Sequence, residues 1–190
     1  IPSAPSDFKT VESTMKTRQH GFTMIELIVV IVILGILAAV ALPRFTNVQR
    51  DARIAKLNAA RGAVQAAAAM IHGAALARGG IADTVPCPGA GNPGTANNTT
   101  TVCTENGRVN IVNTYPAATS AGIINAAGLS PSIWTPTTAQ LGQEGYGIAG
   151  NNPISIRVTG GTDPTTCFFT YAQAAANAAP VISAVTTTGC

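Results

Sequence analysis

A single carboxylate, Glu26, stands at the head of an apolar run that extends from Leu27 to Leu42. From Phe22 to Leu42, a helix that rises roughly 1.5 Å per residue is about 32 Å long, close to the ~30 Å hydrocarbon core of a bilayer. The run is therefore long enough to span a membrane. An ionised carboxylate in hydrocarbon costs on the order of 2.5 to 3.5 kcal/mol on insertion scales, so we expect Glu26 to have a cationic partner.

The residues alone leave a second interpretation of this run open. Ala39-Val40-Ala41 has the A-x-A pattern at which an ordinary signal peptidase cuts, and a signal anchor can carry a stray acid. Against this, the apolar region of a signal peptide normally contains no charge, whereas Glu26 lies inside this one. The mature amino terminus separates the two interpretations, because signal-peptidase cleavage would expose Leu42.

The composition after the apolar run predicts one modest domain with few charges. Charged residues make up 10% of the chain, against about 25% in typical globular proteins, which suits a surface that packs against copies of itself. The formal net charge of +3 is too small to imply a general field for nucleic acid. Basic residues do cluster after the apolar run, and we expect them to form a solvated or intersubunit face rather than a nucleic-acid or acidic-lipid contact: Arg50, Arg53, Lys56 and Arg61.

Four cysteines follow the apolar run, at Cys87, Cys103, Cys167 and Cys190. An even number without a C-x-x-C pair or a nearby histidine favours disulfides in an oxidising compartment over a metal site, with reduced thiols as the alternative. Three pairings are possible. We favour Cys87 with Cys103 and Cys167 with Cys190, because each closes a short loop.

The helical pattern predicts one rod from about Thr23 to Arg78. Pro43 is expected to kink or offset it by removing one hydrogen bond. One apolar face recurs at helical spacing and should be buried, and Gly79-Gly80 is a stop signal. That face comprises Ile54, Leu57, Val64, Ala68, Ile71 and Ala75.

The remainder of the chain predicts an antiparallel sheet packed against the rod, which is an α+β fold. Asp83 to Gly107 is a loop by composition, and Ala121 to Leu129 suggests a short helix or turn before Trp134, an expected core residue. Strand-like runs are Arg108–Asn113, ended by Tyr115-Pro116, then Tyr146–Ala149, Ile154–Val158 and Cys167–Tyr171, with Pro180–Thr187 returning as a hairpin.

No arrangement of residues predicts catalysis. The histidines are His20 and His72, and no nucleophile has a plausible base. Asp83, Glu105, Glu144 and Asp163 are too isolated for a paired acid/base site or a calcium loop. We therefore expect no enzyme activity, no metal and no cofactor.

The amino-terminal residues carry a family resemblance. Lys16-Thr17-Arg18-Gln19-His20-Gly21, Phe22-Thr23-Met24-Ile25-Glu26-Leu27 and the apolar run to Pro43 resemble the cleavage and methylation signature of type IV pilins and type II secretion pseudopilins. The resemblance implies that a prepilin peptidase cuts between Gly21 and Phe22 and methylates the new amine of Phe22. It also implies that Glu26 neutralises the terminal amine of a neighbouring subunit.

The resemblance also divides the chain. Residues 1–21 would be a leader that is removed, with 1–14 as an upstream extension before the favoured start at Met15. Residues 22–43 would be the transmembrane helix, which becomes the filament core. Residues 44–190 would continue the helix and form the disulfide-stapled head. The chain would be held in the bacterial inner membrane with its carboxyl terminus in the periplasm, and would become extracellular on assembly.

Other segments narrow the resemblance to the mannose-sensitive haemagglutinin (MSHA) group of type IV pilins. They are Pro43-Arg44-Phe45, Asp51-Ala52-Arg53, Tyr115-Pro116, and the ending from Cys167-Phe168-Phe169-Thr170-Tyr171 to Cys190. The implied function is a structural subunit of a surface filament for adhesion, and for motility in some settings. Implied partners are copies of itself, minor pilins, the prepilin peptidase, the inner-membrane platform and its motor ATPase. A type II secretion pseudopilin is one alternative, and a membrane-anchored or secreted binding module is the other.

Overall fold

The structure is a computed structural model that describes residues 21–88, 94–105, 107–130, 136–161 and 163–190. It divides into two compact units, one ending at Arg44 and the other running from Phe45 to Cys190, and each is considered by itself. The expected leader up to His20 and the expected core residue Trp134 lie outside the described residues.

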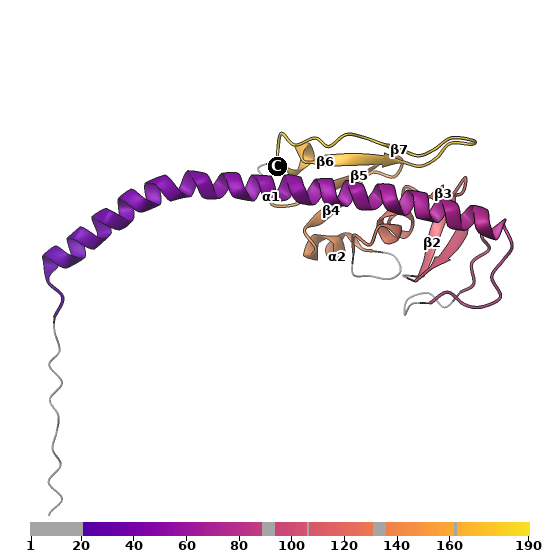
Figure 1. Ribbon diagram of the computed structural model, residues 1–190, viewed down its shortest axis with the longest axis horizontal. Coiled ribbons are helices and arrows are strands. Elements are labelled where there is room, and N and C mark those ends of the chain that lie inside the picture. The colour runs from indigo at the N-terminus through magenta and orange to yellow at the C-terminus, as the bar shows by residue number, and fades with distance from the viewer. Residues whose placement is uncertain (1–20, 89–93, 106, 131–135, 162) are drawn as a thin grey trace, which may run out of the picture. The chain divides into compact units, whose positions relative to one another are not determined.

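The elements follow one another as a long helix, a first group of strands and a second group of strands (Figure 1). The helices are α1 (Met24–Arg78), the π-helical turn η1 (Ser120–Ile124), α2 (Thr138–Gln143) and the 3₁₀ turn η2 (Pro164–Thr166). The strands are β1 (Thr101–Thr104), β2 (Gly107–Val112), β3 (Tyr115–Pro116), β4 (Tyr146–Ala149), β5 (Ile154–Val158), β6 (Phe168–Ala172) and β7 (Val181–Ile182).

Helix α1 ends where the sequence predicts. Gly79 and Gly80 follow it with φ of 56° and 75°, the left-handed region that glycine adopts without a Cβ penalty. The Gly79 N–H donates to the carbonyl oxygen of Ala75 at 3.2 Å, which satisfies one of the terminal carbonyls. The predicted limits of Thr23 and Arg78 are thus confirmed to within one residue.

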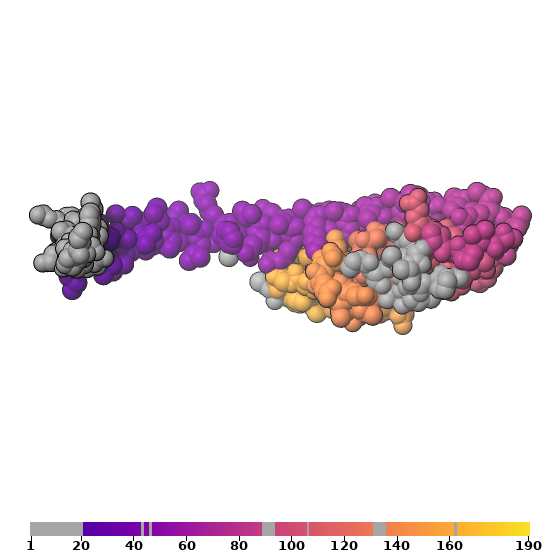
Figure 2. Space-filling model, turned by 90° about the horizontal axis from the view of Figure 1, so that it is seen from below, coloured from indigo at the N-terminus to yellow at the C-terminus, as the bar shows by residue number. Residues whose placement is uncertain are grey.

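The predicted apolar face of α1 is confirmed as the buried face in the second unit. Leu57 and Val64 are fully buried, and Ile54 packs partly buried beside them. The other members of the predicted face, Ala68, Ile71 and Ala75, are at most 4% exposed. Strands and loops pack against this one flank of the helix (Figure 2).

The antiparallel strands expected from the sequence are present, but they form two sheets rather than one. The first has the order β1-β2-β3 and the second β4-β5-β6-β7, and every pairing is antiparallel. The buried Tyr171 of β6 joins the two groups, because its hydroxyl donates to the carbonyl oxygen of Pro116 in β3 at 2.7 Å. Burial raises the pKa of the Tyr171 hydroxyl, so it remains a donor at neutral pH.

Several predicted strands match and others need correction. β4 and β5 have the predicted limits, β6 is shifted by one residue, and β7 pairs with β6 as the predicted returning hairpin. The predicted strand Arg108–Asn113 is β2, and it ends before Tyr115-Pro116 as expected. The prediction missed that Tyr115-Pro116 is itself a strand, β3, which folds back on β2 after a two-residue turn. Proline is tolerated there because β3 is an edge strand.

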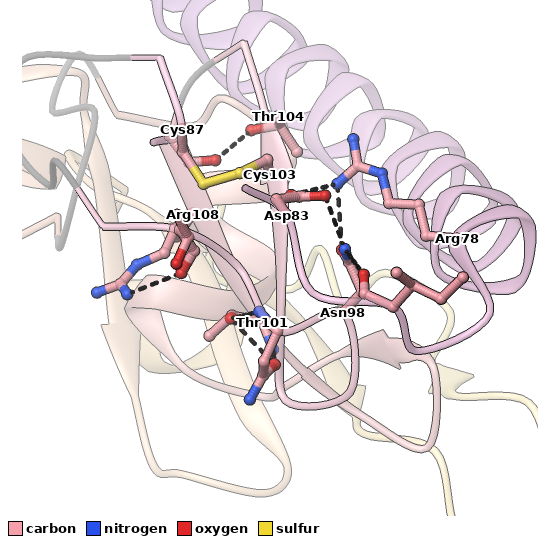
Figure 3. Close-up of polar contacts among 12 residues, drawn as sticks. Arg78, Asp83, Cys87, Asn98, Thr101, Cys103, Thr104 and Arg108 are labelled. Atoms are coloured by element: carbon pink, nitrogen blue, oxygen red, sulfur yellow. Dashed lines mark hydrogen bonds and ion pairs between the residues drawn. A yellow bond between two sulfur atoms is a disulfide. The ribbon is translucent and has the colours of Figure 1, made fainter. Parts of the chain in front are cut away.

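The described parts of the predicted loop from Asp83 to Gly107 contain a strand, β1, and a set of hydrogen bonds to the end of α1. Asn98 is 3% exposed, and its amide nitrogen donates to the carbonyl oxygen of Ile81 at 2.6 Å and to the Asp83 carboxylate at 2.9 Å. Arg78, the last residue of α1, bonds to the Asn98 side-chain oxygen at 3.2 Å and lies 3.5 Å from the Asp83 carboxylate (Figure 3). These contacts tie the loop to the end of the helix.

Two disulfides close the head. Cys87 is joined to Cys103 within this segment (Figure 3), and Cys167, the residue before β6, is joined to Cys190. These are the two pairs favoured from the sequence. Cys167 and Cys190 are at most 4% exposed and belong to the main core, so this second disulfide is packed among apolar side chains.

Replacing Cys167 and Cys190 together with serine should destabilise the head by about 3 kcal/mol, the chain-entropy value for a loop of this size. The two cysteines lie 23 residues apart in sequence. We expect the variant to unfold at lower urea concentration and to be cleaved faster by protease than the unreduced wild type. Protease resistance equal to that of the wild type would show that packing alone holds this end of the chain.

Candidate functional site

The predicted processing point lies in exposed, non-helical chain. Gly21, Phe22 and Thr23 precede α1, which begins at Met24, and the Phe22 side chain is 86% exposed. A Cβ placed on Gly21 would meet no other described atom within 4 Å. A protease can therefore approach the Gly21–Phe22 peptide bond from outside without unwinding the helix.

Glu26 is held by a local motif that our sequence interpretation missed. The backbone N–H of Thr23 donates to Glu26 Oε2 at 2.9 Å, and the Thr23 hydroxyl donates to the same oxygen at 2.6 Å. In return, the Glu26 N–H donates to Thr23 Oγ1 at 3.3 Å. This reciprocal pair is a capping box, and the Thr-x-x-Glu pattern that encodes it is readable in the sequence.

The capping box leaves part of the carboxylate available. All of the hydrogen bonds to it go to Oε2, and among the described residues none reaches Oε1. No lysine or arginine of the first unit's described residues lies in an ion pair with Glu26. The expected cationic partner is therefore not found within the described part of this chain, whereas a second chain could supply it.

Thr23 should matter for assembly because it fixes the direction of the carboxylate. Thr23→Val removes the hydroxyl but keeps the size of the side chain, and loss of such a cap costs about 1 kcal/mol of helix stability. We expect fraying of the first helical turn and a partial loss of filament yield, with cleavage unchanged. Thr23→Ser, which keeps the hydroxyl, is the control and should behave like the wild type; equal filament yields for all three chains would contradict this role.

The apolar run itself is uncovered. Its residues from Met24 to Leu42 are all exposed, and none of the most apolar 18-residue window of α1 is buried. By length and composition the helix can cross a membrane. Residue Pro43 lies inside α1, so the helix assignment continues past it, and the kink expected there stays a prediction.

Three of the four basic residues after the run bond to the head instead of forming a purely solvated face, whereas Arg50 is exposed. The alternative that the face lies between subunits stays a prediction. Arg53 donates through Nη1 to the carbonyl oxygen of Cys190 at 2.8 Å, and Arg61 donates through Nε to that of Ser183 at 2.9 Å. Lys56 donates to the carbonyl oxygen of Glu144 and lies 4.4 Å from the centre of the Tyr146 ring. Three cations of α1 are thus bonded to three separate segments of the head.

Arg61→Ala should therefore destabilise the head by about 1.5 to 3 kcal/mol, the range for a hydrogen bond from a charged group. Its partner Ser183 also bonds to Thr170 of β6, so the loss should loosen the end of the sheet. Urea unfolding of the full chain in mild detergent measures the effect. Arg50→Ala removes the same charge from an exposed position and should change stability by less than about 0.5 kcal/mol; equal effects for the two variants would contradict the proposed role of Arg61.

The side chain of His72 is held by contacts within the head. Its Nδ1 lies 2.8 Å from Thr114 Oγ1, and its ring stacks on Tyr115 with centres 3.9 Å apart. The Thr114 hydroxyl donates to the carbonyl oxygen of Asn113, so it accepts from His72, which places the proton on Nδ1. Within the described residues no group of three or more potential metal ligands occurs.

Comparison with known proteins agrees with these features at the amino terminus. Residues 16–42 match the family model described as the prokaryotic N-terminal methylation motif. Over 53 residues, 28% of this chain, the sequence is 49% identical to the type IV narrow pilus major component PilA5 of Thermus thermophilus. Over the same length it is 40% identical to the type IV major fimbrial protein FimA of Dichelobacter nodosus.

A third relative shows the same pattern. The chain is 52% identical over 42 residues, 22% of its length, to the type IV major pilin protein PilE1 of Neisseria gonorrhoeae. The matches cover 46%, 34% and 26% of these three relatives, so the chain spans less than half of their length. No solved structure gives a significant match.

Proposed function

We propose that the protein is a structural subunit of a type IV pilus of the MSHA type. The proposal is supported by the amino-terminal segment, which matches the prokaryotic N-terminal methylation motif and is similar to the corresponding segment of type IV pilins. The observation that carries the proposal is an uncovered apolar helix headed by one hydrogen-bonded carboxylate, directly after an accessible Gly21–Phe22 bond. A soluble protein would bury such an apolar helix in its core. In a simple membrane anchor, the charge of Glu26 would make insertion less favourable without any compensating interaction.

The proposed sequence of events starts in the inner membrane. The prepilin peptidase cuts after Gly21 and methylates the Phe22 amine, and the segment from Phe22 to Pro43 holds the subunit in the bilayer with its head in the periplasm. An assembly platform and its motor ATPase then lift the subunit out. In the filament, apolar contact among neighbouring helices replaces contact with lipid.

The head portion of α1 suits such close packing. Opposite its buried face it presents a row of exposed small residues, which allow helices to approach closely. The members of the row are Ala52, Ala55, Ala59, Gly62, Ala66, Ala69 and Gly73. The three cation–carbonyl bonds link the head to this helix, and the disulfides cross-link segments within the head. Both features support a role in a filament under mechanical load.

Electron microscopy of sheared surface material, from cells with and without this chain, tests the proposal. We expect long thin filaments that an antibody against the head labels along their whole length, and none without the chain. Absence of labelled filaments from the sheared material, with the processed chain retained in the cell envelope, would favour a type II secretion pseudopilin. Release of the chain as a single soluble species whose first residue is Leu42 would contradict both and favour a secreted binding module.

A further inference from the structure

A hollow of about 440 Å³ in the second unit lies between the early part of its helix and the segment around the Cys167–Cys190 disulfide. Its lining includes Asn47, Arg50 and Arg53 from α1, with Gly160, Gly161 and Cys190 opposite. Among the described lining residues there is no aspartate or glutamate. The side chains that α1 contributes to the hollow are thus polar or positively charged.

The two arginines differ in the hydrogen bonds that their guanidinium groups already make within the chain. Arg53 has one of its nitrogens fixed by the carbonyl oxygen of Cys190 at 2.8 Å, which orients the guanidinium and leaves most of its five N–H groups for another acceptor. Arg50 is exposed and makes no hydrogen bond or ion pair within the described part of the chain. Arg50 is therefore the residue that a bound anion would engage most strongly.

Glycine backbone forms the opposite wall and keeps the hollow open. Gly160 has φ of 86°, and a Cβ placed on it would lie 3.8 Å from Arg53 Nε. A Cβ on Gly161 would collide with the carbonyl oxygen of Gly189. A Cβ at Gly160 would lie in ordinary contact with the guanidinium, whereas a side chain at Gly161 would displace the segment that carries Cys190.

We propose that Arg50 and Arg53 bind a phosphate group in this hollow, and that the phosphate is the headgroup of an anionic phospholipid. Guanidinium groups match the geometry of phosphate oxygens, and basic clusters next to membrane spans attract anionic lipid. The lipid source rests on the proposed function, in which the run ending at Leu42 lies in the bilayer, because Asn47, Arg50 and Arg53 follow that run closely in sequence. The contact would hold the stored subunit and would be lost on assembly.

Native mass spectrometry of the processed full-length chain in neutral detergent micelles tests this proposal. The probes are phosphatidylglycerol and phosphatidylcholine, and the measurement is the ratio of the two lipids that the chain retains. We expect the wild type to prefer phosphatidylglycerol. Arg44→Gln removes one basic charge beside the run but outside the hollow, so it should lower the ratio by at most about fivefold, the diffuse effect of one basic residue near an anionic surface. Arg50→Gln removes the same charge and also its direct contact with the phosphate, so it should lower the ratio by more than about tenfold.

A competition with glycerol phosphate and with inorganic phosphate shows whether the bound phosphate group belongs to a lipid headgroup or to a small free anion. If phosphatidylglycerol is the ligand, either small anion should displace it only in large excess. Binding of the small anions without any preference for phosphatidylglycerol would overturn the lipid assignment. An equal loss with Arg44→Gln and Arg50→Gln would overturn the hollow as a site, since diffuse charge would then explain the preference. Either negative result would leave filament formation by the wild type unaffected, so the proposed function is tested separately.

Discussion

Glu26→Ala is expected to abolish or reduce filament yield by at least about tenfold while cleavage after Gly21 proceeds normally. In the proposed filament the carboxylate would compensate a terminal amine that the core would otherwise bury without a partner, and coupling energies for close buried charge pairs are roughly 1.5 to 7 kcal/mol. A loss of only 1.4 kcal/mol is already tenfold in an equilibrium constant. Processed subunits should accumulate in the membrane fraction, where removal of the acid also makes insertion more favourable.

Glu26→Gln is the matched control for this result. Glutamine can keep the capping box with Thr23, because an amide oxygen accepts the same two hydrogen bonds, but it carries no charge. We expect Glu26→Gln to lose filaments nearly as severely as Glu26→Ala. Filaments from the glutamine variant at wild-type yield would mean that Glu26 acts through helix capping and not through its charge.

Gly21→Leu is expected to block cleavage of the leader almost completely. The peptide bond after Gly21 lies in exposed chain before α1, and a peptidase that binds this backbone closely has no room for a branched side chain there. The precursor should keep its leader, so Phe22 would have no free amine and Glu26 no partner. Mass measurement of the membrane-bound chain reports the leader directly.

Gly21→Ala serves as the control because it adds a single methyl group, and it should be processed at least in part. Filaments should be absent from cells that express only Gly21→Leu. A mature product of unchanged mass from the leucine variant would contradict the assignment of the cleavage point.

Much of the helix and several strands were predictable because their signals are local. The end of α1 follows from Gly79 and Gly80, and β4 and β5 are short runs of strand-forming residues bounded by turns. β1 was missed because Thr101–Thr104 lies in a segment whose composition is that of a loop. α2 was missed although Thr137 and Gln140 form a capping box, since the helix has only six residues.

The partners of the basic residues could not be predicted from the sequence. Arg53, Lys56 and Arg61 bind carbonyl oxygens that lie 137, 88 and 122 residues away. A carbonyl group exists at every position, so no residue type identifies the acceptor, and an exposed basic face was the natural expectation. The division of the strands into two sheets has a similar cause, because it depends on which strand edges meet and not on the pattern within each strand.

The pairing of Glu26 with the Phe22 amine of a neighbouring subunit is tested most directly by cryo-electron microscopy of the native filament at side-chain resolution. We predict that the Phe22 nitrogen, free of Gly21 and methylated, lies within about 4 Å of the Glu26 carboxylate of an adjacent subunit, the distance of an ion pair. A filament in which Phe22 is still joined to Gly21, or in which each Glu26 contacts only the amine of its own chain, would contradict this account.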